Sequence, residues 1–221
     1  MGKIVHIAID GPSGAGKSTI AKRVAKALNV LYLDTGAMYR AIGLKALKGQ
    51  IDREDEAQLS KMMESTTLDI RFEENEQRVY LDGVDISLEV RTPDVSKAAS
   101  DVSRWPSVRL NMVEQQRAIA KSKSLVMDGR DIGTYVLPDA QYKFFMTASS
   151  KVRATRRYLQ LKEVGKEKPL DEIENEIIAR DKQDMERDFA PLCQAKDAHY
   201  LDTSDLSINQ VVDKMLEVIG R

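Results

Sequence analysis

The stretch Gly11-Pro12-Ser13-Gly14-Ala15-Gly16-Lys17-Ser18 decides the fold, because it matches the phosphate-binding pattern G-x-x-x-x-G-K-[ST]. Before it, residues 4–9 form a nearly continuous apolar run, which is typical of a strand covered on both faces. After it, apolar residues at helical spacing predict a helix over residues 17–28. The spacing differs from G-x-G-x-x-G, which disfavours a dinucleotide-binding loop. A strand, a glycine-rich turn and a helix in this order predict a P-loop α/β protein.

The chemistry of this loop suits a nucleoside triphosphate. Glycines let successive backbone N–H groups wrap an anion, and the following helix directs its positive end toward the same place. Lys17 can reach the β- and γ-phosphates, and the Ser18 hydroxyl can bind Mg²⁺. We therefore expect the phosphates of a nucleoside triphosphate to be bound by Gly11, Pro12, Ser13, Gly14, Ala15, Gly16, Lys17, Ser18 and Thr19.

Strand and helix patterns alternate along the rest of the chain. Further strands are predicted at residues 31–33, 125–127, 142–146 and 199–201. Helices are predicted at residues 107–121, 149–164, 170–188 and 207–219. This alternation predicts a three-layer fold, in which about five parallel strands are covered by helices on both faces.

One segment follows a different pattern. Apolar and polar residues alternate between residues 68 and 91, and Asp82-Gly83 is a turn pair. Flanking helices are predicted at residues 53–63 and 93–103. We expect a small antiparallel sheet at residues 66–91, inserted in the α/β chain.

Composition narrows the function. The 221 residues include 34 Lys and Arg against 35 Asp and Glu, so a broad nucleic-acid-binding surface is not favoured. Cys193 is the single cysteine, which fits a reducing compartment. The sequence shows no signal peptide pattern and no apolar run of membrane-spanning length. We expect a cytoplasmic protein without a membrane partner, and a monomer because no apolar interface stripe is evident.

Arginines and carboxylates at strand ends and on helices favour a small-molecule kinase over an NTP-hydrolysing switch. A kinase holds two anionic substrates and needs several converging arginines. Arg40 follows a predicted strand and turn, and Asp128, Arg130 and Asp131 lie at the end of another strand. Two helix faces carry further ladders, namely Arg153, Arg156 and Arg157, and Arg180, Asp184 and Arg187. A solvated face with weak ion pairs is the alternative for these ladders.

Several segments resemble the bacterial cytidylate kinase family of P-loop nucleoside monophosphate kinases. They are Asp10 to Ser18, Asp34-Thr35-Gly36-Ala37-Met38-Tyr39-Arg40, Asp128-Gly129-Arg130-Asp131-Ile132-Gly133-Thr134, and Arg180-Asp181-x-x-Asp184-x-x-Arg187. The resemblance spans essentially the whole chain, including the insertion. It implies transfer of the γ-phosphoryl group of MgATP to CMP or dCMP, in pyrimidine nucleotide metabolism. UMP or another small metabolite as acceptor is the alternative among kinases.

The resemblance also implies a role for each matching residue. Lys17, Asp128, Arg130 and Arg156 would be catalytic, with Mg²⁺ on Ser18 and Asp128 acting on the ion from outside its ligand shell. Arg153, Arg156 and Arg157 would bind ATP from a short lid at residues 153–168. The substrate-binding set would be Ser13, Asp34, Gly36, Tyr39, Arg40, Ser100, Arg109, Arg130, Asp131, Arg180, Asp184 and Arg187. Arg40, Arg130 and Arg187 would hold the acceptor phosphate. Ser100, Arg109 and Asp131 would bind the base, and Arg180 and Asp184 the ribose.

The implied division of the chain follows these roles. Residues 1–34 and 109–221 would form the P-loop core, and residues 35–108 the region that binds the nucleoside monophosphate.

Overall fold

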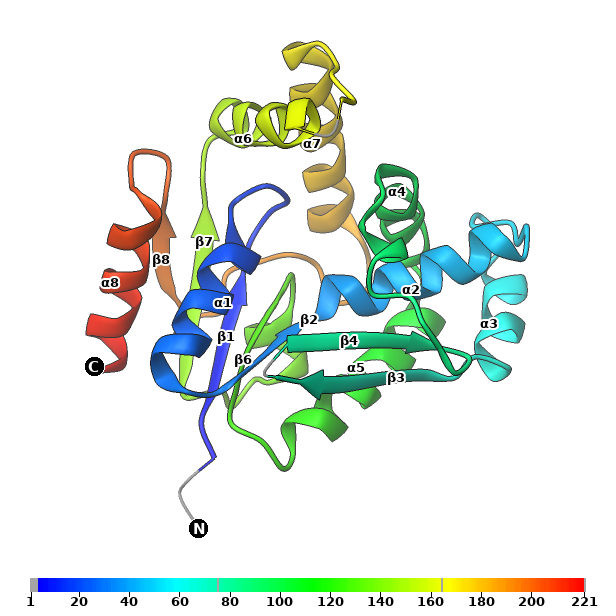
Figure 1. Ribbon diagram of the computed structural model, residues 1–221, viewed down its shortest axis with the longest axis horizontal. Coiled ribbons are helices and arrows are strands. Elements are labelled where there is room, and N and C mark those ends of the chain that lie inside the picture. The colour runs from blue at the N-terminus through cyan, green and yellow to red at the C-terminus, as the bar shows by residue number, and fades with distance from the viewer. Residues whose placement is uncertain (1–3, 75, 164, 221) are drawn as a thin grey trace. The chain divides into compact units, whose positions relative to one another are not determined.

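The computed structural model describes residues 4–74, 76–163 and 165–220 (Figure 1). Its main sheet has five strands in the order β2-β6-β1-β7-β8. Their bounds are β1 His6–Asp10, β2 Leu31–Asp34, β6 Leu125–Gly129, β7 Tyr142–Thr147 and β8 His199–Asp202. β7 runs parallel to both β1 and β8, with Ile9 opposite Phe144 and Phe144 opposite His199. The predicted α/β fold with a five-stranded parallel sheet is confirmed.

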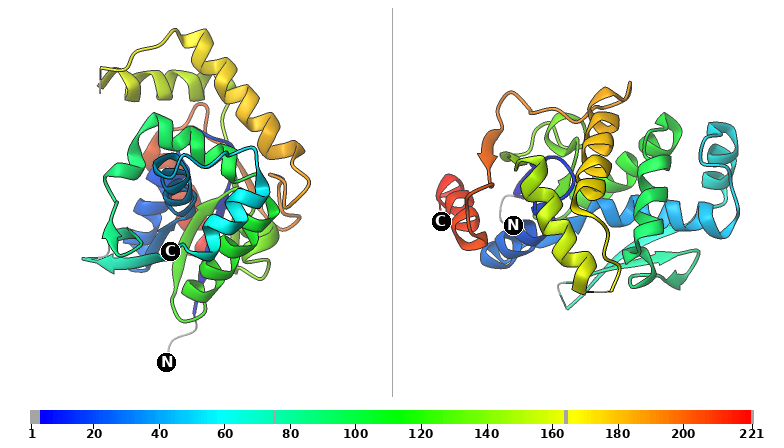
Figure 2. Two further views of the ribbon diagram at one scale, coloured as in Figure 1. Left: turned by 90° about the vertical axis from the view of Figure 1, so that its right-hand side faces the viewer. Right: turned by 90° about the horizontal axis from the view of Figure 1, so that it is seen from above.

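Helices alternate with the strands along the chain. Their bounds are α1 Lys17–Leu28, α2 Thr35–Lys48, α3 Glu56–Glu64, α4 Pro93–Val102, α5 Pro106–Ala120, α6 Ser150–Glu163, α7 Leu170–Glu186 and α8 Ile208–Ile219. Two shorter turns are η1, a 3₁₀ turn at Glu89–Arg91, and η2, a π-helical turn at Ile132–Val136. α8 packs beside α1 (Figure 1), and α6 and α7 are neighbouring helices in both views of Figure 2.

Local chemistry sets several helix ends. α1 ends at Leu28, and the next residue, Asn29, caps it in the left-handed conformation with φ 53°. α8 begins with a capping box, in which the Ser207 side chain accepts from the Gln210 amide and the Gln210 side chain accepts from the Ser207 amide. The predicted start of α1 is confirmed, because Gly16 immediately precedes the helix.

The inserted sheet has three antiparallel strands in the order β3-β4-β5. They are β3 Leu68–Glu73, β4 Glu76–Leu81 and β5 Val84–Asp85. Asp82 and Gly83 both have positive φ, 50° and 84°, as a tight hairpin turn requires. Val79 and Leu81 are buried in a cluster with Ala41 of α2. The predicted antiparallel insertion is confirmed, but its strands end at Asp85, and Glu89–Arg91 form the turn η1 instead of a strand.

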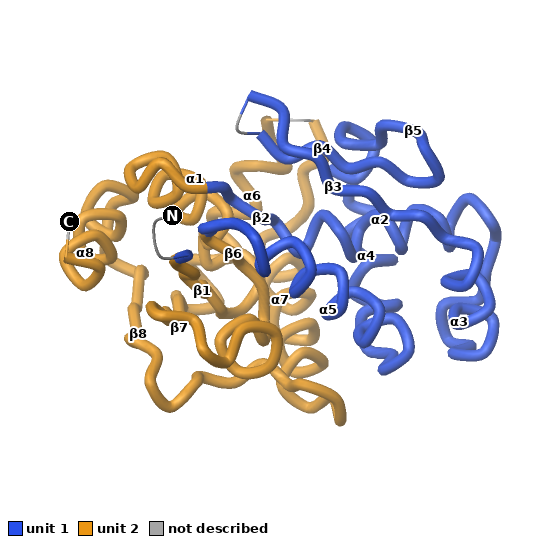
Figure 3. Tube along the Cα trace, turned by 90° about the horizontal axis from the view of Figure 1, so that it is seen from below, with its two compact units in different colours: residues 1–4, 31–125 blue, residues 5–30, 126–221 orange. Residues whose placement is uncertain are grey.

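The chain divides into two compact units (Figure 3). Unit 1 is built mainly from Leu31–Leu125 and contains α2 to α5 and the inserted sheet. Unit 2 is built from Val5–Val30 and Val126–Arg221, and it contains the glycine-rich loop and α6 to α8. The predicted functional division at residues 35–108 concerns ligand binding and stays a prediction.

One helix was missed by the sequence pattern. α2 occupies residues 35–48, where glycines at 36 and 43 disfavour a helix. The structure explains Gly43, because a Cβ there would lie 2.6 Å from the backbone nitrogen of Ala99. The gain from packing α2 closely against α4 outweighs the low helix propensity of glycine.

Some predicted boundaries were wrong by a few residues. The helix predicted from residue 53 begins at Glu56, because the Asp55 carboxylate accepts from the amides of Ala57 and Gln58 and caps it there. β6 continues past Met127, so Asp128 lies within the strand. The predicted end of α6 at Val164 lies outside the described residues. Among the described helices, none is long and apolar enough to cross a membrane.

Candidate active site

The glycine-rich loop connects β1 to α1 and is shaped by its glycines. Gly11, Gly14 and Gly16 have φ values of 148°, 76° and 92°, a region that L side chains rarely adopt. A Cβ on Gly11 would come within 1.9 Å of the Met146 carbonyl oxygen at the end of β7. Glycine is therefore required at residue 11 both by the backbone conformation and by the close approach of β7.

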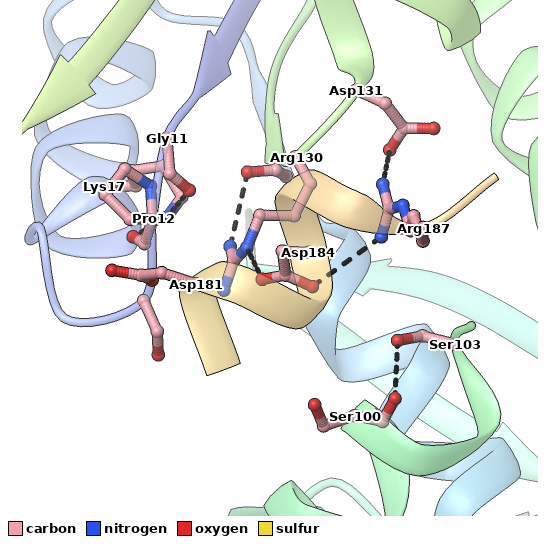
Figure 4. A network of polar contacts seen from close by, with 12 residues as sticks. Gly11, Pro12, Lys17, Ser100, Ser103, Arg130, Asp131, Asp181, Asp184 and Arg187 are labelled. Atoms are coloured by element: carbon pink, nitrogen blue, oxygen red, sulfur yellow. Dashed lines mark hydrogen bonds and ion pairs between the residues drawn. The ribbon is translucent and has the colours of Figure 1, made fainter. Parts of the chain in front are cut away.

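Lys17 turns back onto this loop. Its Nζ donates to the carbonyl oxygens of Gly11 and Pro12, each at 2.7 Å (Figure 4). Burial and the positive charge of Arg130 lower the pKa of Lys17 to about 7, and the Asp128 carboxylate opposes this shift. An anionic phosphate placed beside Lys17 would favour its charged form. The ammonium is thus held in the loop at a place where a phosphate would stabilise its charge.

Ser18 and Asp128 provide oxygen atoms suited to a magnesium ion. The Ser18 hydroxyl donates to Asp128 Oδ2 at 3.0 Å. Asp128 is 5% exposed and lies near the end of β6, whereas Ser18 is exposed. A hydroxyl beside a strand-end carboxylate matches the donor set that P-loop proteins offer to Mg²⁺. These residues fit the predicted ion.

A buried network of arginines and aspartates lies on the same unit. Arg130 Nε donates to Asp184 Oδ2 at 2.7 Å, and Arg187 lies 3.7 Å from Asp184 Oδ1 (Figure 4). Arg187 also lies 3.7 Å from Asp131 Oδ1. The structure therefore brings together four of the predicted substrate-binding residues.

The charges in this network stabilise one another. Burial disfavours the charged form of Asp184, but the charges of Arg130, Arg180 and Arg187 outweigh it and lower the pKa of its carboxyl group. Burial also opposes the charge on Arg130, while Asp184 and its neighbours raise the Arg130 pKa. The ladder on α7 is thus buried in part rather than a solvated face, because Asp184 is only 4% exposed.

The predicted lid arginines have different surroundings. Arg153 is 6% exposed; it donates to the carbonyl oxygens of Ala148 and Ser13 and pairs with Asp181 Oδ2 at 2.6 Å. Arg156 donates to the carbonyl oxygen of Thr203 at 2.7 Å. Arg153 and Arg156 therefore both contact the glycine-rich loop, Arg153 through Ser13 and Arg156 through the Ala15 carbonyl oxygen at 3.3 Å. Arg157 instead contacts Gln160 on its own helix.

Asp10 is a site residue for which the sequence analysis gave no role. Its carboxylate accepts from the amides of Ile132 and Gly133 at 2.8 and 2.7 Å, and so joins the end of β1 to the turn that follows Asp131. Burial raises the pKa of Asp10 to about 7, although both amides lower it. In the sequence, only the position of Asp10 immediately before the glycine-rich loop could have pointed to it as a candidate site residue.

Unit 1 holds a second group of predicted residues at the start of α2. Asp34 caps this helix, because its Oδ1 accepts from the Ala37 amide at 2.9 Å. Its other oxygen, Oδ2, accepts from Arg40 at 2.8 Å. A Cβ on Gly36 would lie 3.0 Å from Arg40, so glycine leaves room for the guanidinium. Arg40 Nε is buried with no hydrogen-bond partner among the described residues.

Two other helices of unit 1 carry Ser100 and Arg109, two of the three residues predicted to bind the base. Arg109 is 1% exposed, and it donates to the Ser103 carbonyl oxygen at 3.0 Å. The Ser103 hydroxyl donates to the Ser100 carbonyl oxygen at 3.0 Å. The Arg109 guanidinium also lies 5.5 Å from the centre of the Tyr39 ring. These contacts link Ser100 of α4, Ser103 at the end of that helix, Arg109 of α5 and Tyr39 of α2 within unit 1.

Comparisons with known proteins show the family of this chain. The family model described as cytidylate kinase matches residues 7–221. The chain belongs to the cytidylate kinase family. A cytidylate kinase of Caldicellulosiruptor bescii is 48% identical over 98% of this chain and 96% of that protein. A cytidylate kinase of Bacillus cereus is 48% identical over 100% of this chain and 98% of that protein.

Solved structures outside the close relatives of this cytidylate kinase family member share its fold. A shikimate kinase of Bacteroides thetaiotaomicron aligns with a TM-score of 0.51 at 16% identity, covering 99% of this chain and 100% of that chain. A protein of Eubacterium ventriosum aligns with a TM-score of 0.52 at 12% identity, covering 98% of each chain. At such identities the likeness concerns the fold alone.

Proposed function

We propose that the protein transfers the γ-phosphoryl group of MgATP to CMP or dCMP, giving ADP and CDP or dCDP. The family assignment supports a nucleoside monophosphate kinase. The observation that carries the reaction type is Lys17, a buried ammonium inside a glycine-rich loop whose backbone can surround phosphates.

In the proposed reaction an oxygen of the acceptor phosphate attacks the γ-phosphorus of ATP. The bond from that phosphorus to the β,γ-bridging oxygen breaks, and ADP leaves with the bond's electron pair. Phosphoryl transfer of this kind depends on in-line placement and charge stabilisation more than on covalent help from the protein. Lys17 would stabilise the charge on the transferring group, and Arg156 would bind the donor phosphates beside it.

Ser18 would hold Mg²⁺, with Asp128 orienting the Ser18 hydroxyl. When bound, the ion supplies positive charge to the phosphate oxygens. The remaining residues of the loop, including Ser13, and Thr19 in the first turn of α1 are proposed to bind ATP through backbone and side-chain donors. Arg153 and Arg157 would complete ATP binding from α6, where Arg153 also supports the Ser13 carbonyl.

We propose acceptor roles for residues of both units, each argued from its own surroundings. Arg40 would bind the phosphate of CMP, because its Nε is buried and without a hydrogen-bond partner among the described residues. Arg130 would bind the same phosphate, with Asp184 aligning its guanidinium. Arg187 would act with Arg130, since both arginines contact Asp184.

Recognition of cytosine is proposed for Asp131, Arg109 and Ser100. A carboxylate can accept from the exocyclic amine of cytosine, and Arg and Ser can donate to its ring acceptors. Uracil places an acceptor where cytosine has the amine, so the carboxylate would be left unpaired or repelled. Arg180 and Asp184 would hold the ribose. The cytoplasmic location, the monomeric state and the lack of a nucleic-acid partner stay predictions.

An acceptor screen tests the proposal directly. Purified protein is incubated with MgATP and, in separate reactions, CMP, dCMP, UMP, shikimate or no acceptor, and ADP release is measured. We expect ADP only when an acceptor is present, with CMP and dCMP giving the highest kcat/KM. ADP release that is equal with and without an acceptor would identify an NTP-hydrolysing protein and contradict the proposal.

A further inference from the structure

The inserted sheet makes a specific polar contact with the acceptor side of unit 1. Gln77 lies on β4, and its side-chain amide contacts both backbone groups of Asp34. The Asp34 N–H donates to Gln77 Oε1 at 2.7 Å, and Gln77 Nε2 donates to the Asp34 carbonyl oxygen at 3.2 Å. A side chain thus pairs with the last residue of β2 as a neighbouring strand would.

Asp34 in turn contacts Arg40 through its side chain. With its backbone held by Gln77, the Asp34 carboxylate accepts from the Ala37 amide at 2.9 Å and from Arg40 at 2.8 Å. The Asp34 and Arg40 side chains are 22% and 25% exposed, so solvent screens this pair only in part. The direction of the Arg40 guanidinium therefore depends on where Asp34 lies.

The remainder of β4 fixes the position of Gln77. Alternation along a strand places Gln77, Val79 and Leu81 on one face. Val79 and Leu81 are buried with Ala37 and Ala41 of α2. The Val79 amide also donates to the Ser87 hydroxyl at 2.9 Å. The inserted sheet is thus packed on α2 along the same face that presents Gln77 to the start of that helix.

We infer that Gln77 is a positioning residue for the acceptor phosphate, and that the inserted sheet serves to hold Asp34 and Arg40 in place through it. The inference rests on the proposed function, because Arg40 must bind the phosphate of CMP. It gives the insertion a role in the reaction: β4 sets the direction of an arginine that α2 carries.

Steady-state kinetics of Gln77→Leu test this role. Leucine keeps most of the volume but leaves the Asp34 N–H and carbonyl groups without their partner. We expect the KM for CMP to rise about tenfold, as for the loss of a partner to partly buried polar groups, with the KM for ATP unchanged. The control is Arg78→Leu, on the opposite face of β4, where the guanidinium lies near Glu73 at 3.7 Å. We expect its KM for CMP to match the wild type.

A double-mutant cycle separates positioning from general support of the fold. If Gln77 acts through Arg40, Gln77→Leu should add no further rise in the KM for CMP in an Arg40→Ala background. Equal effects in the two backgrounds would overturn the inference. So would a wild-type KM for CMP in Gln77→Leu, or a matching rise in the KM for ATP.

Gln77→Glu covers the case in which the leucine variant does not fold. It keeps an acceptor for the Asp34 N–H but places a carboxylate oxygen against the Asp34 carbonyl, so the KM for CMP should again rise. A wild-type KM in this variant would also contradict the inference. Wild-type protein that fails to phosphorylate CMP would instead refute the proposed function, so the two failures are distinguishable.

Discussion

The glycine-rich loop of unit 2 and the start of α2 in unit 1 are both strand-to-helix turns that position a cation, but they do so by different means. In the loop, Lys17 donates to carbonyl oxygens only six and five residues away. At α2, Arg40 is held by Asp34, whose backbone is held in turn by Gln77, 43 residues away in sequence. Lys17 is positioned by local backbone geometry, whereas Arg40 is positioned by packing of the inserted sheet.

This difference has a consequence for mutations. A change in the loop acts on the group proposed to stabilise the transferring phosphoryl, so it should lower kcat. A change around α2 acts on an acceptor contact, so it should raise the KM for CMP. The following experiments probe this contrast, from the largest expected effect to the smallest.

Replacing Lys17 with alanine should produce the largest effect. We expect kcat to fall by about 10²–10³-fold, the usual cost of removing a preorganised group that stabilises transition-state charge. The fold should survive, because burial of the Lys17 ammonium is unfavourable, as its lowered pKa shows, and alanine removes that cost. Turnover and a thermal melt are the measurements, with Lys26→Ala on the exposed side of α1 as control. Turnover near the wild-type value would contradict the role of the loop.

Replacing Asp131 with alanine should weaken discrimination between acceptors. The ratio of kcat/KM for CMP to that for UMP should fall at least about tenfold, because the carboxylate that would reject uracil is absent. Kinetics on both nucleotides provide the measurement. Asp139→Ala, an exposed change in the same segment, should keep the wild-type ratio. An unchanged ratio in Asp131→Ala would exclude this residue from base recognition.

Replacing Arg40 with alanine should raise the KM for CMP and leave the KM for ATP unchanged. The expected rise is about tenfold or more, as for the loss of a charge-assisted hydrogen bond. Lys48→Ala at the other end of α2, which removes an exposed pair with Glu89, is the matched control. A larger effect on ATP than on CMP would erase the proposed contrast between the two turns.

Replacing Asp10 with asparagine should change how stability depends on pH. The folded protein holds the Asp10 proton up to a pKa of about 7, whereas an unfolded aspartate releases it near about 4. Between these values the folded state binds more protons, so this group lowers stability as pH rises, by at most about 1.4 kcal/mol per pH unit.

The free energy of unfolding of Asp10→Asn should therefore fall less steeply with pH than that of the wild type. Urea titrations at several pH values between the two pKa values measure both curves. Asp139→Asn serves as an exposed control and should follow the wild-type curve. Parallel curves for the wild type and Asp10→Asn would show that Asp10 does not titrate in this window.

Most of the fold could be predicted from the sequence, and the reasons are local. The buried strands β1 and β6 each contain a short apolar run, and α1 follows a glycine-rich turn. α2 could not be predicted in this way. Gly43 lowers its helix propensity, and the compensating contact with Ala99 of α4 is a tertiary one.

The candidate site shows the same division. Motif spacing predicted roles for Lys17, Ser18, Asp128 and Arg130, because a phosphate loop and strand ends imply their chemistry, and these roles stay predictions. Asp181, the partner of Arg153, was quoted in a motif but given no role, and nothing pointed to Thr203, which accepts from Arg156. These residues support others through pairings that no spacing rule encodes.

The amino-acid sequence by itself determined the parallel α/β architecture, the phosphate loop and the presence of an antiparallel insertion, because these depend on residue type and short-range periodicity. Only the tertiary structure decided that Gln77 hydrogen-bonds to the backbone of Asp34 and that Asp10 accepts from the amides of Ile132 and Gly133. The same is true of the buried ion pair between Arg153 and Asp181. Such contacts join residues far apart in the chain, and close packing selects them once the elements have assembled.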